Sequence, residues 1–292
     1  CVGVIAASVI MMGLIALPSM IQRGYSKELA CGCVCAGGTL GILIPPSVML
    51  VFYGPMSGLS VGKLFMGAFM PGLLLSALYC IYILIYSGLN PEMAPPIPAE
   101  ERAMPLLKQT YILFSGLIPP VFMILAVLGA IFFGVASPTE AAGVGALASV
   151  ILALVYRRFS LEVLKTSLLE TLQVTCMAFL IGWGATVFTG VFLKLGAGVV
   201  VTNMVLATPG GSWGAFFVIQ FIIFILGMFI DWIGILFIMI PIVTPIAATL
   251  GFDALWFALM ICVNLQTSFL TPPFAYAIFF VKGITKPEWG VS

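Results

Sequence analysis

Histidine is absent from this chain of 292 residues, and charged residues make up only 7% of it. Without imidazole groups, histidine-rich zinc sites and histidine-based acid–base catalysis are excluded. The chain also lacks a phosphate-binding loop of the form G-x-x-x-x-G-K-[ST], which argues against a nucleotide-driven pump. The net charge of +1 gives no reason to expect nucleic acid or another acidic partner.

The seven cysteines lack the spacing of a disulfide framework. Cys31, Cys33 and Cys35 occupy every second position, which spreads them around a helix instead of along one face. Free cysteine usually packs as a small apolar side chain. We therefore interpret these three as packing residues.

Long apolar segments dominate what is present. Hydrophobic residues form 62% of the chain, well above their share in soluble domains. Segments of about 20 apolar residues, long enough to cross a bilayer core, recur from end to end. The sequence predicts an all-α polytopic membrane protein, with candidate segments at 1–21, 29–54, 64–86, 111–134, 141–156, 174–193, 215–230, 232–250 and 255–281. An amphipathic stretch at 161–173 predicts a separate helix in the membrane interface.

Lysine and arginine favour the cytoplasmic side of a membrane, so their positions test the predicted order in which the segments cross it. When the segments cross alternately, Lys63 and Lys194 fall on one side. The opposite, cytoplasmic side receives Arg23, Lys27, Arg102, Lys108, Arg157, Arg158, Lys165, Lys282 and Lys286. Nine residues against two support the order of the segments.

A double proline interrupts an apolar run twice, in GTLGILIPPS at 38–47 and in NLQTSFLTPPF at 264–274. Pro45-Pro46 and Pro272-Pro273 lie 227 residues apart. At the same offset, Pro18, Gly24 and Tyr25 match Pro245, Gly251 and Phe252. Charge threading puts the two copies in opposite orientations, and inverted repeats with discontinuous helices are typical of secondary transporters.

Proline cannot donate a helix hydrogen bond and disfavours helix in the residue before it. Each interruption should therefore expose backbone groups at membrane depth, where only protein or a water-filled site can satisfy them. Unwound carbonyls and nearby hydroxyls suit a hard cation, and half-helix N-termini attract anions. The hydroxyls concerned are those of Thr39, Ser47, Thr267, Ser268 and Thr271. The alternative is a plain kink whose hydroxyls repair neighbouring backbone groups.

Three further polar residues lie in apolar surroundings. Asn264 and Gln266 are amides inside a long apolar run, and either could bind a ligand or form a helix-to-helix hydrogen bond. Asp231 separates the segments 215–230 and 232–250. If these form a re-entrant hairpin, Asp231 lies near the membrane middle and is a candidate functional carboxylate. If both span the bilayer, it lies in a cytoplasmic surface turn. By the repeat offset, the tip of a first hairpin falls near Val4.

Four motifs occur in order: GTLGILIPPS, ASPTEAAGVGA, GMFIDWIGILFIMIPIVTPIAATLGFDALWF and NLQTSFLTPPF. Together they resemble the large membrane subunit of TRAP (tripartite ATP-independent periplasmic) transporters over essentially the whole chain. The resemblance implies a sodium-coupled importer of small organic acids in the bacterial cytoplasmic (inner) membrane. It further implies a small membrane subunit, a periplasmic substrate-binding protein and an elevator mechanism, with no cofactor besides Na⁺.

The resemblance also implies roles for individual residues. Ion-binding residues would be Gly38, Thr39, Gly41, Asp231, Thr267, Ser268 and Thr271. Substrate-binding residues would be Pro45, Pro46, Ser47, Asn264, Gln266, Pro272 and Pro273. The only metal expected is sodium, with no transition metal.

The expected division follows the repeat. Residues 1–63 supply first-repeat transport elements, 64–208 scaffold and interfacial arm helices, and 209–292 second-repeat transport elements. We expect the chain to be a fragment that lacks N-terminal and C-terminal parts. Two alternatives are a sodium-coupled carboxylate carrier that works without a binding protein and, less well supported, an intramembrane enzyme. The enzyme would need paired carboxylates at depth, and no second carboxylate is expected to face Asp231.

Overall fold

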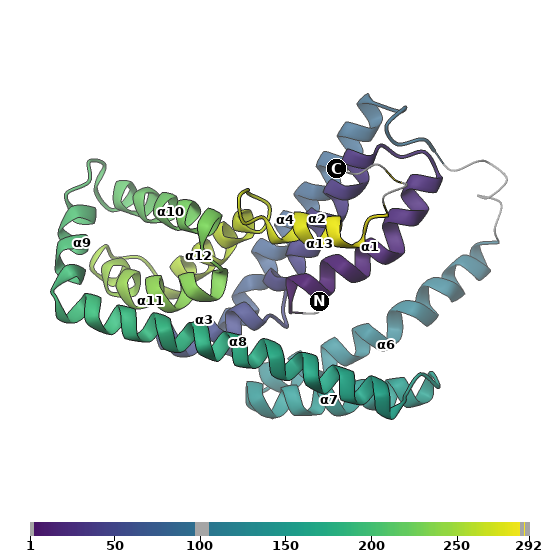
Figure 1. Ribbon diagram of the computed structural model, residues 1–292, viewed down its shortest axis with the longest axis horizontal. Coiled ribbons are helices and arrows are strands. Elements are labelled where there is room, and N and C mark those ends of the chain that lie inside the picture. Colours follow the sequence, from purple (N-terminus) through teal and green to yellow (C-terminus); the bar gives the residue numbers. More distant parts are fainter. Residues whose placement is uncertain (1–2, 97–104, 287–288, 290–292) are drawn as a thin grey trace.

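The structure is a computed structural model that describes residues 3–96, 105–286 and 289 (Figure 1). Within these residues all regular structure is helical. The first helices are α1 (Ile5–Gln22), α2 (Lys27–Leu43), α3 (Val48–Ser57) and α4 (Val61–Leu89). The middle of the chain forms α6 (Leu106–Phe132), α7 (Pro138–Val155), α8 (Leu161–Lys194) and α9 (Ala197–Leu206). The last part forms α10 (Gly211–Phe229), α11 (Trp232–Thr249), α12 (Ala254–Ser268) and α13 (Tyr276–Ile284).

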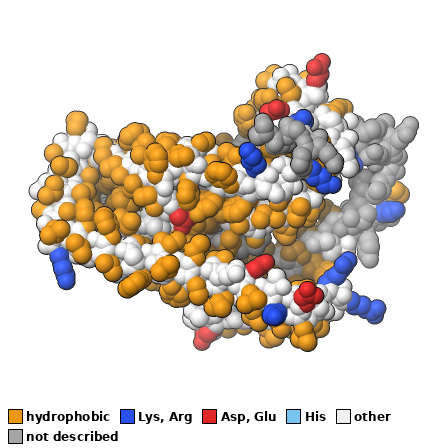
Figure 2. Space-filling model, in the orientation of Figure 1, with side chains coloured by type: hydrophobic (Ala, Val, Ile, Leu, Met, Phe, Trp, Pro, Cys, Tyr) orange, Lys and Arg blue, Asp and Glu red, His pale blue; other side chains and the backbone are white. Residues whose placement is uncertain are grey.

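Eight spans of the described chain are long and apolar enough to cross a membrane, α2 and α3 together counting as one of them. The predicted all-α polytopic membrane protein is thereby confirmed. Figure 2 shows hydrophobic side chains over most of the visible surface. Phe122 of α6 and Trp183 of α8 are 72% and 70% exposed, which suits contact with lipid and not with water.

The predicted repeat is visible in the helix boundaries. Helices α1 and α11 begin and end at positions that differ by the same 227 residues, as do the first residues of α2 and α12. Gly24 and Gly251 end the equivalent helices α1 and α11 with φ angles of 81° and 79°. The N–H groups of Tyr25 and Phe252 each donate, at 3.1 Å, to the carbonyl five residues back. This is the same glycine-dependent C-terminal turn in both copies.

The two copies pack reciprocally. Helix α1 of the first copy lies against α13 of the second, and α11 of the second lies against α3 of the first. In Figure 1 the first-copy helices α1 and α2 lie to the right of centre and α10 to α12 lie to the left, while α13 lies on the right beside α1. Such an exchange is the arrangement expected of two copies related by a two-fold axis. The buried core is drawn mainly from these two copies.

The middle of the chain departs from the sequence prediction in two places. Residues 161–173 do not form a helix of their own, because Leu161–Lys194 is a single helix of 34 residues. It is about 51 Å long at 1.5 Å per residue. Neither proline nor glycine occurs between residues 161 and 181, so nothing ends the amphipathic part before the apolar part begins. The ten-residue helix α9 was not predicted.

The start of α7 is fixed by a capping box formed by Ser137 and Glu140. The Ser137 N–H donates to the Glu140 carboxylate at 2.7 Å, and the Glu140 N–H donates to the Ser137 hydroxyl at 3.4 Å. We expect Ser137→Ala to destabilise the protein by about 1 kcal/mol, because it orphans one helical N–H group. The check is the midpoint of thermal unfolding in detergent, with Ser149→Ala as a control. Ser149 donates only to the Ala146 carbonyl of its own helix.

Candidate functional site

The first break separates α2 from α3 over residues 44–47, and the Pro45-Pro46 bond within it is cis. Ser47 bridges the break. Its hydroxyl donates to the Ile42 carbonyl and accepts from the Leu50 N–H group at 3.3 Å. One buried side chain therefore links the end of one half-helix to the start of the next.

The beginning of the described chain reaches into this break. The Gly3 N–H donates to the Gly41 carbonyl at 3.2 Å, and the Gly3 carbonyl accepts from the Val48 N–H at 3.4 Å. Gly3 has a φ of 71°, and a side chain there would lie 3.2 Å from the Pro46 carbonyl oxygen. The backbone just before α1 thus lies at the first break, and a hairpin with its tip near Val4 stays a prediction.

Helix α1 closely approaches α2 at Gly38 and Gly41. A methyl group on Gly38 would meet the Val9 side chain and lie 3.1 Å from the Val9 Cα. A methyl group on Gly41 would meet the Ser8 hydroxyl. Between these glycines, Thr39 is fully buried and donates to the Ala36 carbonyl at 2.8 Å. The glycines therefore hold α1 against α2, and their role in ion binding stays a prediction.

The second break separates α12 from α13 over residues 269–275, and its Pro272-Pro273 bond is also cis. The Phe274 N–H donates to the Met228 carbonyl, near the end of α10, at 3.1 Å. Each break is therefore bonded to the backbone of a segment next to a helix end, Gly3 before α1 at the first break and Met228 near the end of α10 at the second. They differ in exposure, since Pro272 and Pro273 are exposed whereas Pro45 is buried.

Asp231 lies at the tip between α10 and α11, which pack against each other. Its carboxylate accepts from the Ile233 N–H at 3.1 Å and caps α11. The Tyr276 hydroxyl, at the start of α13, lies within hydrogen-bonding reach of the same carboxylate. The tip thus lies inside the protein at the second break, which favours the hairpin over a surface turn.

Four predicted hydroxyls share one orientation. Thr267, Ser268 and Thr271 each donate at 2.6 Å to a carbonyl three or four residues back, as Thr39 does at 2.8 Å. A hydroxyl whose O–H already donates a hydrogen bond in this way presents its oxygen lone pairs to other groups. Such oxygens accept a cation or a donor. They also repair the backbone, so the predicted alternative of simple backbone repair remains open.

The two amides have different surroundings. Asn264 donates to the backbone carbonyl of Gln220 at 2.6 Å and to its side-chain oxygen at 2.7 Å, which joins α12 to α10. This is the helix-to-helix hydrogen bond that the sequence analysis gave as the alternative to ligand binding. Gln266 is 2% exposed and donates to the Cys262 carbonyl at 3.4 Å, yet its side-chain oxygen has no partner. A buried acceptor without a partner is costly and fits a bound cation.

The breaks bring helix ends of opposite polarity together. The carbonyl ends of α2 and α12 and the amide ends of α3 and α13 meet at the two breaks. Carbonyl ends attract cations and amide ends attract carboxylates. Joint binding of a cation and an organic anion at these helix ends stays a prediction.

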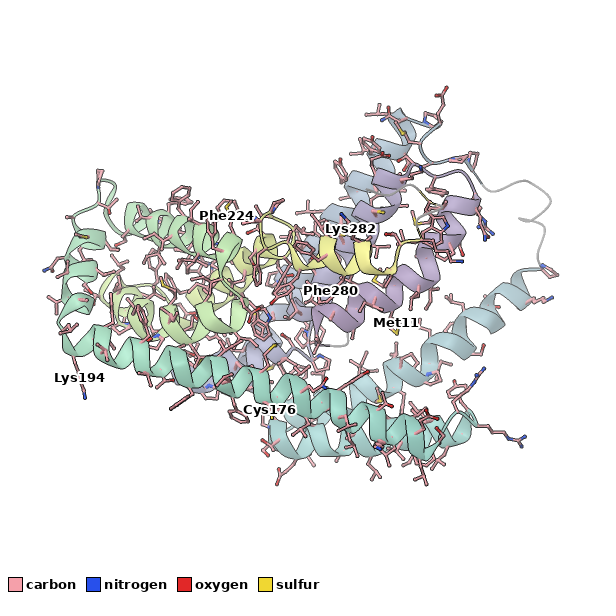
Figure 3. The ribbon with its side chains drawn as sticks, viewed as in Figure 1. Met11, Cys176, Lys194, Phe224, Phe280 and Lys282 are labelled. Carbon is pink, nitrogen blue, oxygen red and sulfur yellow. The ribbon has the colours of Figure 1, made fainter. Side chains whose placement is uncertain are left out.

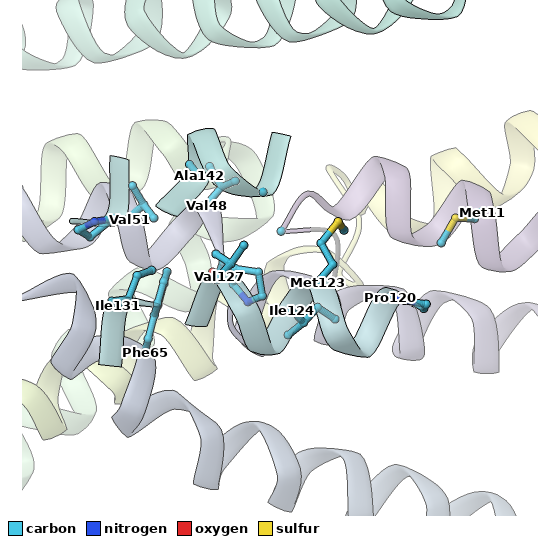
Figure 4. Close-up of a pocket in the computed structure, with 15 residues that line it drawn as sticks. Met11, Val48, Val51, Phe65, Pro120, Met123, Ile124, Val127, Ile131 and Ala142 are labelled. Carbon is cyan, nitrogen blue, oxygen red and sulfur yellow. The ribbon is translucent and has the colours of Figure 1, made fainter. Parts of the chain in front are cut away.

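A cavity of about 680 Å³ separates the first break from α6 and α7 (Figure 4). Pro46 and Ser47 line it on one side, and Met123, Val127 and Ile131 of α6 line it on the other. Its walls are mostly apolar. Helices α6 and α7 thus face the broken helix across an apolar gap.

Paired broken helices of this kind are typical of helical membrane transport proteins. Residues 1–291 match the family described as the DctM component of the tripartite ATP-independent periplasmic transporter, and the chain belongs to that family. The predicted TRAP resemblance is thereby confirmed.

Relatives agree with this assignment. The chain is 33% identical to the C4-dicarboxylate TRAP transporter large permease protein DctM of Pseudomonas aeruginosa, over 98% of this chain and 66% of the relative. It is 31% identical to the protein of the same name in Vibrio cholerae, over 96% of this chain and 65% of the relative. The sialic acid TRAP transporter large permease protein SiaM of Vibrio cholerae is 30% identical over 94% and 62%. The chain thus spans about two thirds or less of the length of these relatives, which are named as permeases and not as enzymes.

Proposed function

We propose that this chain is the membrane permease part of a sodium-coupled secondary transporter that imports small organic acids. The observation that carries the proposal is the pair of broken helices with ends of opposite polarity at each break, together with Asp231 and the hydroxyls at the second break. Related permeases named for C4-dicarboxylates and sialic acid support a carboxylate substrate. The family name, tripartite and periplasmic, supports a small membrane subunit, a periplasmic binding protein and the bacterial inner membrane.

Sodium suits the donor set at the breaks. Hydroxyl, carbonyl and carboxylate oxygens are the ligands that hard cations prefer. Thr267, Ser268, Thr271 and Asp231 would hold one ion at the second break, and Thr39 with the Gly38 and Gly41 carbonyls would hold another at the first. The unpartnered oxygen of Gln266 supports an additional acceptor in the second copy.

An elevator movement fits the way in which the parts are packed. The hairpin tips and broken helices share one buried core. Helices α6 and α7 pack on each other and reach that core chiefly through α4, across the apolar cavity at the first break. An apolar boundary with few polar contacts lets one body slide along another without leaving hydrogen bonds unpaired. The repeats would then move as one unit against α6 and α7.

Uptake measurements test the coupling. We expect Thr267→Ala and Thr39→Ala each to lower sodium-driven uptake several-fold, because each removes one oxygen ligand worth about 1 kcal/mol. The assay uses vesicles that contain the full-length protein together with its partners. Uptake is measured with and without a sodium gradient. Thr202→Ala is the matched control, because the Thr202 hydroxyl also donates to its own helix, at 2.8 Å, but lies in α9. An uptake rate that is the same with and without the sodium gradient would refute the coupling.

A further inference from the structure

Helix α12 carries a buried hydrogen-bond acceptor without a partner. Gln266 is 2% exposed, and its side-chain oxygen accepts no hydrogen bond. The amide nitrogen of the same side chain donates to the Cys262 carbonyl at 3.4 Å, so the side chain folds back along its own helix. Residues four apart share one face of a helix. The unpaired oxygen therefore lies in the protein interior, on the face of α12 to which Cys262 belongs.

A buried donor reaches the same face from α3, which packs against α12. Tyr53 of α3 is 1% exposed, and it lies close enough to Cys262 for their side chains to interact electrostatically. The Tyr53 hydroxyl donates no hydrogen bond to another described residue. A buried tyrosine hydroxyl usually has a partner. The interface between α3 and α12 thus contains an unpaired donor and an unpaired acceptor.

The equivalent interface of the repeat, between α13 and α2, supplies a comparison. At the offset of 227 residues, the position equivalent to Tyr53 is Phe280, which Figure 3 labels on α13. The position equivalent to Gln266 is Thr39, whose hydroxyl donates to the Ala36 carbonyl at 2.8 Å. Phenylalanine has no hydroxyl that needs a partner. The unpaired donor and the unpaired acceptor therefore occur together at one interface and are missing together from the other, as expected of two groups that pair.

We propose that one water molecule bridges the Tyr53 hydroxyl and the Gln266 side-chain oxygen, and that Tyr53 is thereby a positioning residue for the second break. Both side chains are enclosed by the described helices, so only a group as small as water can join them. Buried waters typically bond to polar groups that otherwise lack a partner. The Tyr53 O–H donates to the water, and the water donates to the Gln266 oxygen. An amide oxygen has two lone pairs, so one stays available to a cation.

The bridge connects the two broken helices. Tyr53 lies in the half-helix that follows the first break, and Gln266 directly precedes Thr267 and Ser268, the candidate ion ligands at the second. A fixed amide at position 266 holds the last turn of α12 in one orientation. Without the Tyr53 hydroxyl, the amide oxygen loses its partner and the side chain is free to turn. The proposal rests on the function proposed above, because it concerns the sodium site of that transporter.

A double-mutant cycle tests the pair without any transport measurement. The midpoint of thermal unfolding of the full-length protein is measured in detergent without sodium, for Tyr53→Phe, Gln266→Leu and the double variant. Each single change should lower the midpoint by about 2–4 °C. The double variant should lose less than the sum, because it leaves neither group unpaired. The control cycle combines Tyr53→Phe with Asn264→Leu and should be additive, since Asn264 bonds to Gln220 of α10.

Uptake by vesicles that contain the full-length protein and its partners tests the positioning role. We expect Tyr53→Phe to raise the sodium concentration for half-maximal uptake about threefold to tenfold, with little change in the maximal rate. Tyr82→Phe is the control, because Tyr82 is 63% exposed on α4, and it should change neither quantity. Additive losses in the first cycle, or an unaltered sodium response in Tyr53→Phe, would overturn the proposal. The unfolding cycle needs no sodium, so its failure is distinct from a failure of sodium-coupled uptake.

Discussion

Asp231→Asn is expected to weaken the response of uptake to sodium roughly 10- to 100-fold. The carboxylate is a charged group at the second break, where it accepts from the Ile233 N–H and lies near the Tyr276 hydroxyl. A hydrogen bond or ligand contact to a charged group contributes about 1.5–3 kcal/mol, and 1.4 kcal/mol corresponds to a tenfold change. Asparagine is as good an N-cap as aspartate, so α11 should still begin at residue 232. The measurement is the sodium concentration that gives half-maximal uptake.

Asp253→Asn is the matched control for this change. Asp253 also caps a helix, accepting from the Trp256 N–H at 2.8 Å, but it is exposed at the outer end of α12. The Asp253→Asn change should leave the sodium concentration for half-maximal uptake unaltered. Tyr276→Phe should have a smaller effect than Asp231→Asn, because it keeps the charge. Equal sodium dependence in Asp231→Asn and the unaltered protein would remove Asp231 from the ion site.

Gly38→Leu is expected to cost about 3 kcal/mol or more in stability, at the upper end of what overpacking usually costs. The backbone of α1 leaves no space there, since even a methyl group would lie 3.1 Å from the Val9 Cα. To fit a leucine, α1 would have to move away from α2. That movement would also pull Gly3 and its hydrogen bonds from the first break.

The control for Gly38 lies in the same helix. A side chain on Gly32 would meet nothing within 4 Å, so Gly32→Leu keeps the helix and gains helix propensity. The measurement is the fraction of protein that stays monodisperse in size-exclusion chromatography after heating. If Gly38→Leu survives heating as well as Gly32→Leu does, the close packing of α1 on α2 is not needed for stability.

Much of the fold could be predicted because the length of an apolar segment and the positions of its prolines determine helix formation locally. The break at Pro45-Pro46 divides the helix where backbone chemistry requires it, and the capping box at Ser137 starts α7. Helix α9 was missed because its ten residues are too few to cross a membrane. The continuity of α8 does not follow from the sequence, because the change from an amphipathic to an apolar pattern resembles a helix end.

The candidate site was predictable in its location but less so in its contacts. Proline, hydroxyl and carboxylate positions mark the two breaks, and Asp231 indeed lies at the second one. The partner of each glycine and amide depends on another helix, which no local pattern reveals. Gly38 therefore contacts α1, and Asn264 is bonded to Gln220. Whether these residues also bind ions or substrate stays a prediction.

The reciprocal packing of α1 on α13 and α11 on α3 has a consequence for the history of the fold. Each copy supplies the helix that covers the second half of the other copy's broken helix. A single copy would leave that surface bare, so the partner that best covers it is a second copy inserted in the opposite orientation. Gene fusion would then have fixed one subunit in each orientation and freed the two sequences to diverge. Gly41 and Ser268, equivalent positions with different side chains, record that divergence.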